Sequence, residues 1–307
     1  MPQPERQFDS KRLRLAFGRR APRFAATDFL LREIESRMHE RLEPVRIEPK
    51  RIVDLGCAAG GSFAGLRRRF PEAELLGLDW SAPMLRAALS APGGAQASSW
   101  LKRLLGRGSD PLLVQADWSN LPLASGSANL VWSNLALHWS AEPHKVLPEW
   151  ARLLPAGDGL LIFSAFGPDT FAELRAAFAE VDSGRHLPDF VDMHDLGDML
   201  IAAGLADPVM DAERLTLTYQ TPAGLLEDVR ALGVYPGLDA AAGLRGRGWL
   251  ARLHAALERR RNASGLIPLS LEIVYGHAWK PVPTPGRAGK DGVAILRSDQ
   301  IGRSGKR

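Results

Sequence analysis

The middle of the chain alternates short apolar runs with stretches in which apolar residues recur at helical spacing. This alternation is typical of a parallel sheet covered by helices. Helices are expected over 62–70, directly after Ser81, and around 149–154. The apolar runs expected as strands are 51–55, 74–79, 112–116, 128–132 and 159–163. The pattern therefore predicts an α/β fold.

The flanks of this core follow different patterns. Before the core, an amphipathic helix is predicted over 26–42. Its apolar residues at helical spacing are Phe29, Leu30, Ile34 and Met38. After the core, 166–281 is less regular, with helical patterns and one candidate strand at 269–275. We expect these flanks to add a helical segment in front of the core and cap elements behind it.

Two segments have the composition of loops. Residues 91–110 are rich in glycine and serine around a short basic piece, and they lie between the second helix and the third strand. Either a solvated surface excursion or a docking patch would explain such a loop. From 282 onward Pro, Gly, Lys and Arg occur with little periodicity, which predicts a disordered tail. The expected division is a helical segment or lid (1–45), a core domain with cap elements (46–281) and the tail (282–307).

Composition excludes several classes of function. Among 307 residues there is no apolar run of the roughly 18–20 residues that a membrane span needs. The basic start lacks the apolar region of a secretory signal, so we expect a cytoplasmic location. Cys57 is the single cysteine, which makes a cysteine-based zinc site implausible, and no metal is expected. The net charge of +4 is spread along the chain, so nucleic-acid binding is not expected.

A glycine-rich loop follows the first expected strand. The sequence there is Asp54-Leu-Gly-Cys-Ala-Ala-Gly-Gly61, in which glycines permit a tight turn and close approach of a ligand. A dinucleotide site would need G-x-G-x-x-G, whose second glycine admits the pyrophosphate. Ala58 occupies that position. S-adenosylmethionine (SAM) has no pyrophosphate, so the loop favours SAM over NAD.

Two acids strengthen this interpretation. Asp79 ends the second strand, where a carboxylate can accept both ribose hydroxyls of a nucleoside. Asp117 follows the third strand, where it could accept from the adenine amino group while Trp118 packs on the ring. The full set of expected SAM contacts is Asp54, Gly56, Cys57, Ala58, Gly60, Asp79, Trp80, Met84, Asp117, Trp118 and Asn134.

With these motifs the chain resembles the class I SAM-dependent methyltransferases. More narrowly, it is similar to the malonyl-acyl-carrier-protein O-methyltransferases of biotin synthesis. The motifs that narrow the family are 133–137, 163–170, 190–197 and 275–279. The resemblance implies a Rossmann-like fold, with a mostly parallel seven-stranded sheet, helices on both faces, an N-terminal helical segment and a helical cap. It also implies methylation of the free carboxylate of malonyl-acyl carrier protein, or of malonyl-CoA.

The chain departs from this family at two positions near its start. The family commonly has a tyrosine where this chain has Phe24, and a glutamine where it has Leu31. Other activities stay open: a SAM methyltransferase for another small acid or a quinone-like ring, or a protein arginine hydroxylase-like activity. A related branch, similar to the mitochondrial complex I assembly factors, shares much of the pattern and suggests an assembly protein instead.

A carboxylate is already ionised at neutral pH, so this reaction needs no general base. The enzyme must align the reacting atoms and remove water from the nucleophile. Asn134, Leu135 and His138 follow the fourth strand and are expected at the methyl-transfer site, with Asn134 and His138 in catalytic roles. An arginine would suit the malonyl carboxylate, and Arg19 and Arg185 are the candidates. Aromatic residues expected to close the pocket are Phe17, Phe24 and Trp139.

The resemblance implies an acidic carrier protein as the partner. Basic pieces that could meet it occur at 19–20, 102–103 and 259–261. A run of charge can equally be a solvated face, and the sequence leaves both interpretations open. It gives no indication of the oligomeric state.

Overall fold

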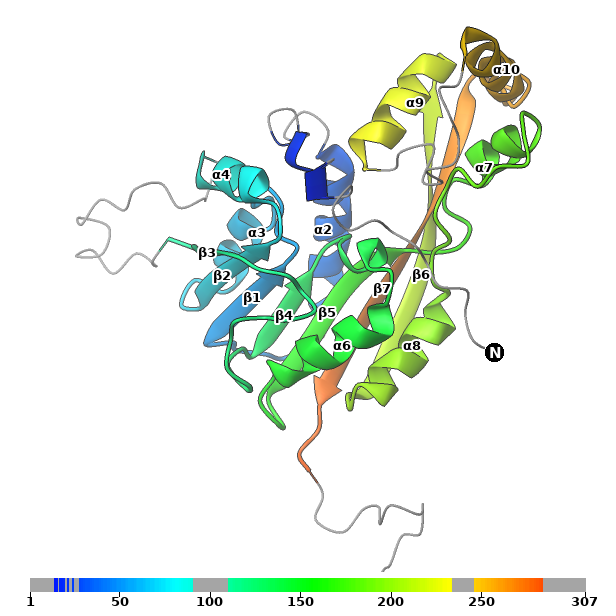
Figure 1. Ribbon diagram of the computed structural model, residues 1–307. Helices are drawn as coiled ribbons and strands as arrows, with labels where there is room; N and C mark the ends of the chain where they lie inside the picture. Colours follow the sequence, from blue (N-terminus) through cyan, green and yellow to red (C-terminus); the bar gives the residue numbers. More distant parts are fainter. Residues whose placement is uncertain are drawn as a thin grey trace, which may run out of the picture.

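The computed structural model describes residues 14, 15, 17–19, 21, 24, 28–90, 110–233 and 246–283. Within them a seven-stranded sheet has the order β3-β2-β1-β4-β5-β7-β6. The first five strands are parallel, β7 is antiparallel to β5, and β6 is antiparallel to β7 (Figure 1). This is the Rossmann-like α/β fold that the resemblance implied.

The parallel strands are short and nearly continuous in apolar residues because both faces of the sheet are covered. Their bounds are β1 Arg51–Leu55, β2 Glu74–Asp79, β3 Leu112–Gln115, β4 Leu130–Ser133 and β5 Gly159–Phe166. All five lie where the apolar runs predicted strands, with boundaries shifted by at most three residues. The apolar runs thus identified every parallel strand.

Successive residues of the strands enter two different cores. Ile52 and Trp132 pack with helices α2 (Phe29–Arg41), α3 (Phe63–Arg69) and α4 (Ala82–Ser90). Val53 and Val131 pack on the other face with α6 (Pro143–Arg152) and α8 (Met193–Ala202). This separation follows from the alternation of side chains along a strand. Figure 1 shows α6 and α8 together on one side of the sheet.

The region after β5 was expected to contain helical patterns and one strand, and that expectation was wrong in part. Two long strands are present, β6 (Ala206–Tyr219) and β7 (Ile267–Lys280). Helices α7 (Ala172–Ala179), α9 (Pro222–Ala231) and α10 (Arg247–Glu258) pack around the ends of these strands (Figure 1). They form the helical cap that the resemblance implied.

Several expectations fall outside the described residues. They include most of the 1–28 segment, nearly all of the 91–110 loop, the basic piece at 102–103 and the tail from 284. The division of the chain at 45 and 281 stays a prediction. Helix α2 packs into the same core as β1, β4 and β5, so apolar contacts join this helix to the sheet.

Candidate functional site

The candidate site lies at the carboxyl ends of β1 and β4, where the strand order reverses direction. Ligands bind at such a switch point in open α/β sheets. The glycine-rich loop leaves β1 there, and Gly56 has φ +75°. A Cβ atom on Gly56 would lie 2.4 Å from the Cβ of Ala136, in the loop after β4. Glycine at this position therefore lets the two loops approach each other.

Two non-glycine residues beside this contact also have left-handed backbones. Ala58 has φ +46° and Leu135 has φ +48°. Such conformations cost energy and cluster at functional sites. They aim backbone donors inward: the Ala58 N–H donates to Asp79 Oδ2 at 3.0 Å, and the Leu135 N–H to Ser164 Oγ at 2.9 Å. Thus Ala58, which marks the departure from a dinucleotide fingerprint, holds the carboxylate that ends β2.

Asp79 is buried, and each of its carboxylate oxygens accepts one hydrogen bond from a backbone N–H. Besides Ala58, the Ser81 N–H donates to its Oδ1 at 2.7 Å. Burial raises the pKa of Asp79 to about 6, and the hydrogen bonds from Ser81 and Ala58 oppose that rise. Each carboxylate oxygen accepts one hydrogen bond and can accept another. The pair of oxygens can therefore receive two hydroxyl groups of a ligand.

One part of the site is a cavity of about 630 Å³, a size usual for small-molecule sites. Its charged side chains are the acids Asp28, Glu35 and Asp54 and one cation, Arg32, which pairs with Asp28 at 2.8 Å. Because acids predominate, we call it the acidic cavity. The Oδ2 atom of Asp54 is buried and has no hydrogen-bond partner among the described residues. Burial raises the pKa of Asp54 well above its usual range, and the neighbouring Glu35 and Asp79 raise it further. The neighbouring buried carboxylates of Asp54 and Glu35 suit a cationic ligand.

Glu35 was missed by sequence reasoning. It comes from α2, is 9% exposed, and its Oε1 lies 3.5 Å from His39 Nε2. A Cβ on Gly65 of α3 would lie 2.3 Å from that same oxygen, so glycine makes room for the carboxylate. The signal was available in the sequence: Glu35 is three residues before Met38, on the apolar face of a predicted amphipathic helix. An acid on that face departs from the pattern.

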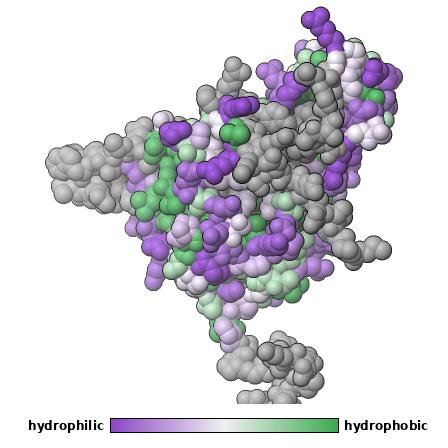
Figure 2. All heavy atoms as spheres, in the orientation of Figure 1, coloured by the Kyte–Doolittle hydropathy of each residue, from purple (hydrophilic) through white to green (hydrophobic). Residues whose placement is uncertain are grey.

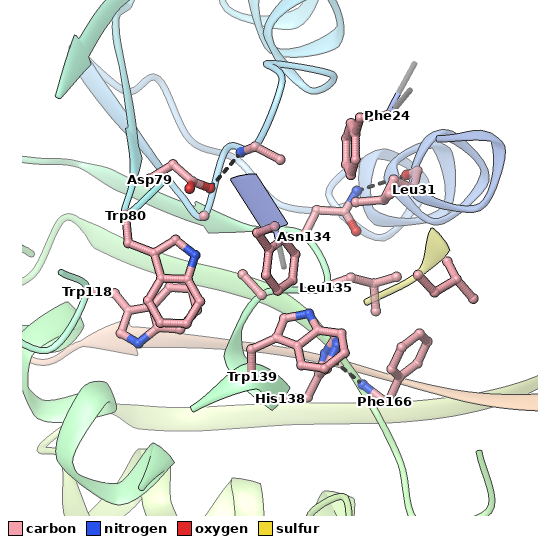
Figure 3. A pocket seen from close by; sticks show the side chains of 15 residues that line it. Phe24, Leu31, Asp79, Trp80, Trp118, Asn134, Leu135, His138, Trp139 and Phe166 are labelled. Carbon is pink, nitrogen blue, oxygen red and sulfur yellow. Dashed lines mark hydrogen bonds between the residues drawn. The ribbon is translucent and has the colours of Figure 1, made fainter. Parts of the chain in front are cut away.

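The other part of the site is lined mostly by aromatic and aliphatic side chains, and Figure 3 looks into it. We call it the aromatic pocket. No arginine or lysine occurs among its described lining residues, and Asp79 and His138 are its ionisable groups. Trp80 and Trp118 stack with ring centroids 4.8 Å apart. The large apolar side chains that line it are Phe17, Phe24, Leu31, Trp80, Trp118, Leu135, Trp139, Phe166 and Leu232.

Asn134 joins the two parts, because it lines both. Its Nδ2 donates to the Leu31 carbonyl oxygen at 2.8 Å, and its Oδ1 accepts from Ser164 Oγ at 2.9 Å. The side chain thus connects the loop after β4 to α2 and to β5. Phe24 and Leu31, the two departures from the family, also line both parts.

The structure brings most of the expected SAM contacts together. Gly56, Cys57, Ala58 and Gly60 line the acidic cavity with Asp54, while Trp80 and Trp118 line the aromatic pocket with Asp79. Burial raises the pKa of the Cys57 thiol well above its usual range, so it is uncharged at neutral pH. These contacts stay predictions, but their placement on one continuous lining is consistent with a shared ligand.

Four expected site residues lie elsewhere. Asp117 is exposed, and its Oδ1 accepts from the backbone N–H of Ser119 at 2.9 Å and from Ser119 Oγ at 2.6 Å. Met84 is fully buried and packs in a small core with Phe24. Arg19 is exposed, and Arg185 is exposed and paired with Asp189. None of the four is among the residues that line either part of the site.

The basic piece at 259–261 is partly neutralised, since its three arginines pair with two glutamates. Arg259 and Arg260 both pair with Glu180, and Arg261 pairs with Glu258. Figure 2 shows hydrophilic residues over α7 and α10, as over much of the visible face. In the described part of the chain, no group of three or more metal-ligating side chains is present. No described helix is both long and apolar enough to cross a membrane.

Comparison with solved structures supports the fold. YcgJ of Bacillus subtilis superposes with a TM-score of 0.55 at 16% identity, covering 80% of this chain and 98% of its own. A protein of Bacillus halodurans gives a TM-score of 0.53 at 16% identity, covering 80% of this chain and 100% of its own. At such low identity these similarities concern the fold alone.

Comparison of sequences identifies the family. The family model described as "Methyltransferase domain" matches residues 53–163. A malonyl-acyl-carrier-protein O-methyltransferase of Laribacter hongkongensis is 44% identical, covering 94% of this chain and 95% of its own. A protein of the same name from Gallionella capsiferriformans is 43% identical, covering 95% of this chain and 97% of its own. The chain therefore belongs to the malonyl-acyl-carrier-protein O-methyltransferase family of SAM-dependent methyltransferases.

Proposed function

We propose that this protein transfers a methyl group from SAM to the free carboxylate of malonyl-acyl carrier protein. The observation that carries the proposal is the similarity to relatives of that name along nearly the whole of both chains, cap included. The family resemblance connects the methyl ester with biotin synthesis. Asn134, at the junction of the acidic cavity and the aromatic pocket, is proposed to keep the two ligands in register.

The residues of the site fit SAM, which supplies a methyl group carried on a positively charged sulfonium. We assign the ribose hydroxyls to the two oxygens of Asp79, each of which has an acceptor position left. The adenine ring is assigned to the region of Trp80 and Trp118, whose faces offer stacking area. In this assignment Asp117 acts at most from the rim, because its carboxylate is exposed.

The acidic cavity fits the other end of SAM. Its α-ammonium group would bind the unpartnered Oδ2 of Asp54 and the neighbouring Glu35. A buried carboxylate without a partner is costly, and a cationic ligand removes that cost. Gly56 and Gly60 have φ of +75° and +77°, which allows their backbone to lie against the ligand without an intervening side chain.

The acceptor would enter the other part of the aromatic pocket, beside His138, Trp139 and Phe166 (Figure 3). Apolar walls remove water from a carboxylate, which makes it a better nucleophile. No base is needed, since the malonyl carboxylate is ionised at neutral pH. The carrier protein itself would remain at the surface, and the exposed Arg19 is one residue that could meet its acidic surface. The described arginines at 259–261 are less suited, because acids of this chain already pair with them.

The proposal is tested by following a radiolabelled methyl group from SAM. The acceptors are malonyl-acyl carrier protein, malonyl-CoA, free malonate and trans-aconitate, with SAM binding measured separately by calorimetry. Base-labile label on the malonyl carrier is expected, because a methyl ester is hydrolysed by base. Label on trans-aconitate alone would make the protein a methyltransferase of another small acid. SAM binding without label on any acceptor would refute the substrate assignment and favour a role in assembly.

A further inference from the structure

His138 lines the aromatic pocket, and one of its ring nitrogens has no hydrogen-bond partner among the described residues. It comes from the short 3-10 helix η2 (Leu137–Trp139), directly after β4, and it is 5% exposed. Its ring packs against Trp139 and Phe166, with centroids 4.7 and 4.4 Å away (Figure 3). Nε2 is buried and has no hydrogen-bond partner among the described residues. A buried polar group without a partner needs an explanation.

The other ring nitrogen determines what Nε2 can do. The backbone N–H of Phe166 donates to His138 Nδ1 at 3.4 Å, so Nδ1 is the acceptor nitrogen. Burial also lowers the pKa of His138 to about 3, so the ring is uncharged at neutral pH. In a neutral imidazole one nitrogen accepts and the other carries the hydrogen. Nε2 is therefore an N–H donor.

Two other polar side chains of the pocket, Asn134 and Asp79, already have hydrogen-bond partners. Asn134 uses Nδ2 on Leu31 and Oδ1 on Ser164. Asp79 is an acceptor already bound to two backbone N–H groups. His138 Nε2–H is thus a buried side-chain donor in the lining of the aromatic pocket that has no partner among the described residues.

We propose that His138 Nε2–H binds the carboxylate of the methyl acceptor and orients it for transfer. This inference rests on the proposed function, because it takes a carboxylate as the acceptor. One carboxylate oxygen accepts from Nε2–H, while the other attacks the methyl carbon. The bond from that carbon to sulfur breaks and its electron pair stays on sulfur. Carboxylate and sulfonium become a neutral ester and a neutral thioether, and no proton moves.

This charge balance explains why an uncharged donor suits the position. Negative charge on the carboxylate declines as the new bond forms, so a cation beside it would stabilise the starting anion more than the transition state. An interaction that is stronger in the ground state does not accelerate the reaction. A neutral N–H donor orients the acceptor carboxylate but stabilises its negative charge less than a cation would. The absence of arginine and lysine from the described lining agrees with this account.

Two amide substitutions separate the donor role from packing. In His138→Gln the amide can accept from Phe166 and still extend an N–H toward the Nε2 position. In His138→Asn the shorter side chain can accept from Phe166, but its N–H cannot reach as far. We expect His138→Gln to stay within about fivefold of the parent kcat for malonyl-acyl carrier protein, and His138→Asn to lose roughly 10–100-fold, the effect of one hydrogen bond to a charged group. SAM affinity should be the same in both.

The protonation state gives a second readout that does not depend on turnover. Nitrogen NMR of the protein labelled at histidine should show Nε2 protonated and Nδ1 unprotonated across pH 6–8. Adding malonyl-acyl carrier protein in the presence of S-adenosylhomocysteine should shift the Nε2–H signal. An Nδ1–H tautomer, or a ring that titrates near its usual pKa of about 6.5, would overturn the inference.

The two proposals fail in different ways. If the parent protein labels no carboxylic acid, the proposed function fails and the inference with it. If the parent labels the malonyl carrier but His138→Gln and His138→Asn lose equal activity, in step with lost thermal stability, His138 only packs and the inference alone fails.

Discussion

The acidic cavity and the aromatic pocket share a wall but differ in charge. Three acids, Asp28, Glu35 and Asp54, line the cavity together with one cation, Arg32, which pairs with Asp28. The pocket has no described lysine or arginine and only Asp79 as an acid. Asp79 lies at their boundary, bonded to Ala58, which lines both. In the proposed reaction a cationic donor meets an anionic acceptor and both charges disappear. The protein thus places most of the charged side chains of the site around the donor, and it offers the acceptor neither a lysine nor an arginine among the described residues of the pocket.

Burying two neighbouring carboxylates in the acidic cavity costs free energy. Asp54 and Glu35 are both buried, and the pKa of Asp54 is raised by burial first and by its acidic neighbours second. Functional sites commonly contain such perturbed groups. A ligand that brings a cation into the cavity would stabilise the fold as well as bind, so SAM should raise the melting temperature.

The largest loss of stability is expected from adding a side chain where the loop after β1 contacts the loop after β4. Gly56→Ala forces a side chain onto a backbone with φ +75° and brings its Cβ to 2.4 Å from Ala136. The strained conformation and the overpacking together should cost about 2–5 kcal/mol of the free energy of unfolding. Urea denaturation measures this loss. Gly61→Ala is the matched control, because a Cβ on Gly61 meets nothing within 4 Å, and an equal loss there would contradict the argument.

Removing the carboxylate at the boundary should weaken SAM binding next most strongly. Asp79→Ala deletes the proposed acceptor of both ribose hydroxyls, and hydrogen bonds to a charged group contribute about 1.5–3 kcal/mol each. Calorimetry should show a loss of SAM affinity of about 100-fold or more. Asp117→Ala serves as comparison, since that carboxylate is exposed, and its effect should stay under about tenfold. The reverse order of the two effects would mean that the nucleoside is held by Asp117.

The acidic cavity can be tested with ligands that differ in charge. Asp54→Asn and Glu35→Gln keep the shape of each side chain but remove its charge. Each should lower the affinity for SAM and S-adenosylhomocysteine by roughly tenfold, because both ligands carry the α-ammonium. Methylthioadenosine, which lacks that group, should bind both variants as well as the parent. Equal losses for all three ligands would show that the substitutions distort the site instead.

Lowering the pH should also weaken the binding of SAM, by protonating Asp79. The pKa of Asp79 is raised to about 6, and the proposed contacts need its ionised form. Binding would then release a proton below pH 6, so the dissociation constant of SAM should rise as pH falls from 7 to 5, approaching tenfold per pH unit below 6. Above pH 7 the affinity should level off. An affinity that is constant down to pH 5 would contradict an ionised Asp79 in the complex.

The sequence predicts the parallel half of the sheet well and the antiparallel end poorly. Buried parallel strands such as Leu130–Ser133 read as apolar runs, which is why their positions were recognised. The β6 strand was missed because it lies at the edge of the sheet, where half-exposed and exposed residues alternate along most of its length. Charged residues such as Glu213 and Arg214 then hide the period of two.

For the site, residues tied to a loop motif were easier to predict than residues that folding brings together. Gly56 and Asp79 follow from the order of strands and loops. Glu35 comes from a helix earlier in the chain, and its role depends on how α2 packs beside Gly65. The expected arginine clamp followed from the charge of the substrate alone. In the proposed reaction the negative charge of the acceptor carboxylate is lost, so the charge of the substrate is a poor guide to the residues that hold it. A role for Arg19 stays a prediction.

In the proposed reaction the acceptor carboxylate lies in a pocket without a described lysine or arginine and is methylated without a base. The most direct test is the single-turnover rate of methyl ester formation on malonyl-acyl carrier protein, with SAM saturating, between pH 7 and 9. Because no proton moves and the malonyl carboxylate is ionised throughout, the account predicts a rate that does not change with pH. A rate that rises about tenfold per pH unit, or that titrates with a pKa near 7, would show that a base takes part and would contradict the account.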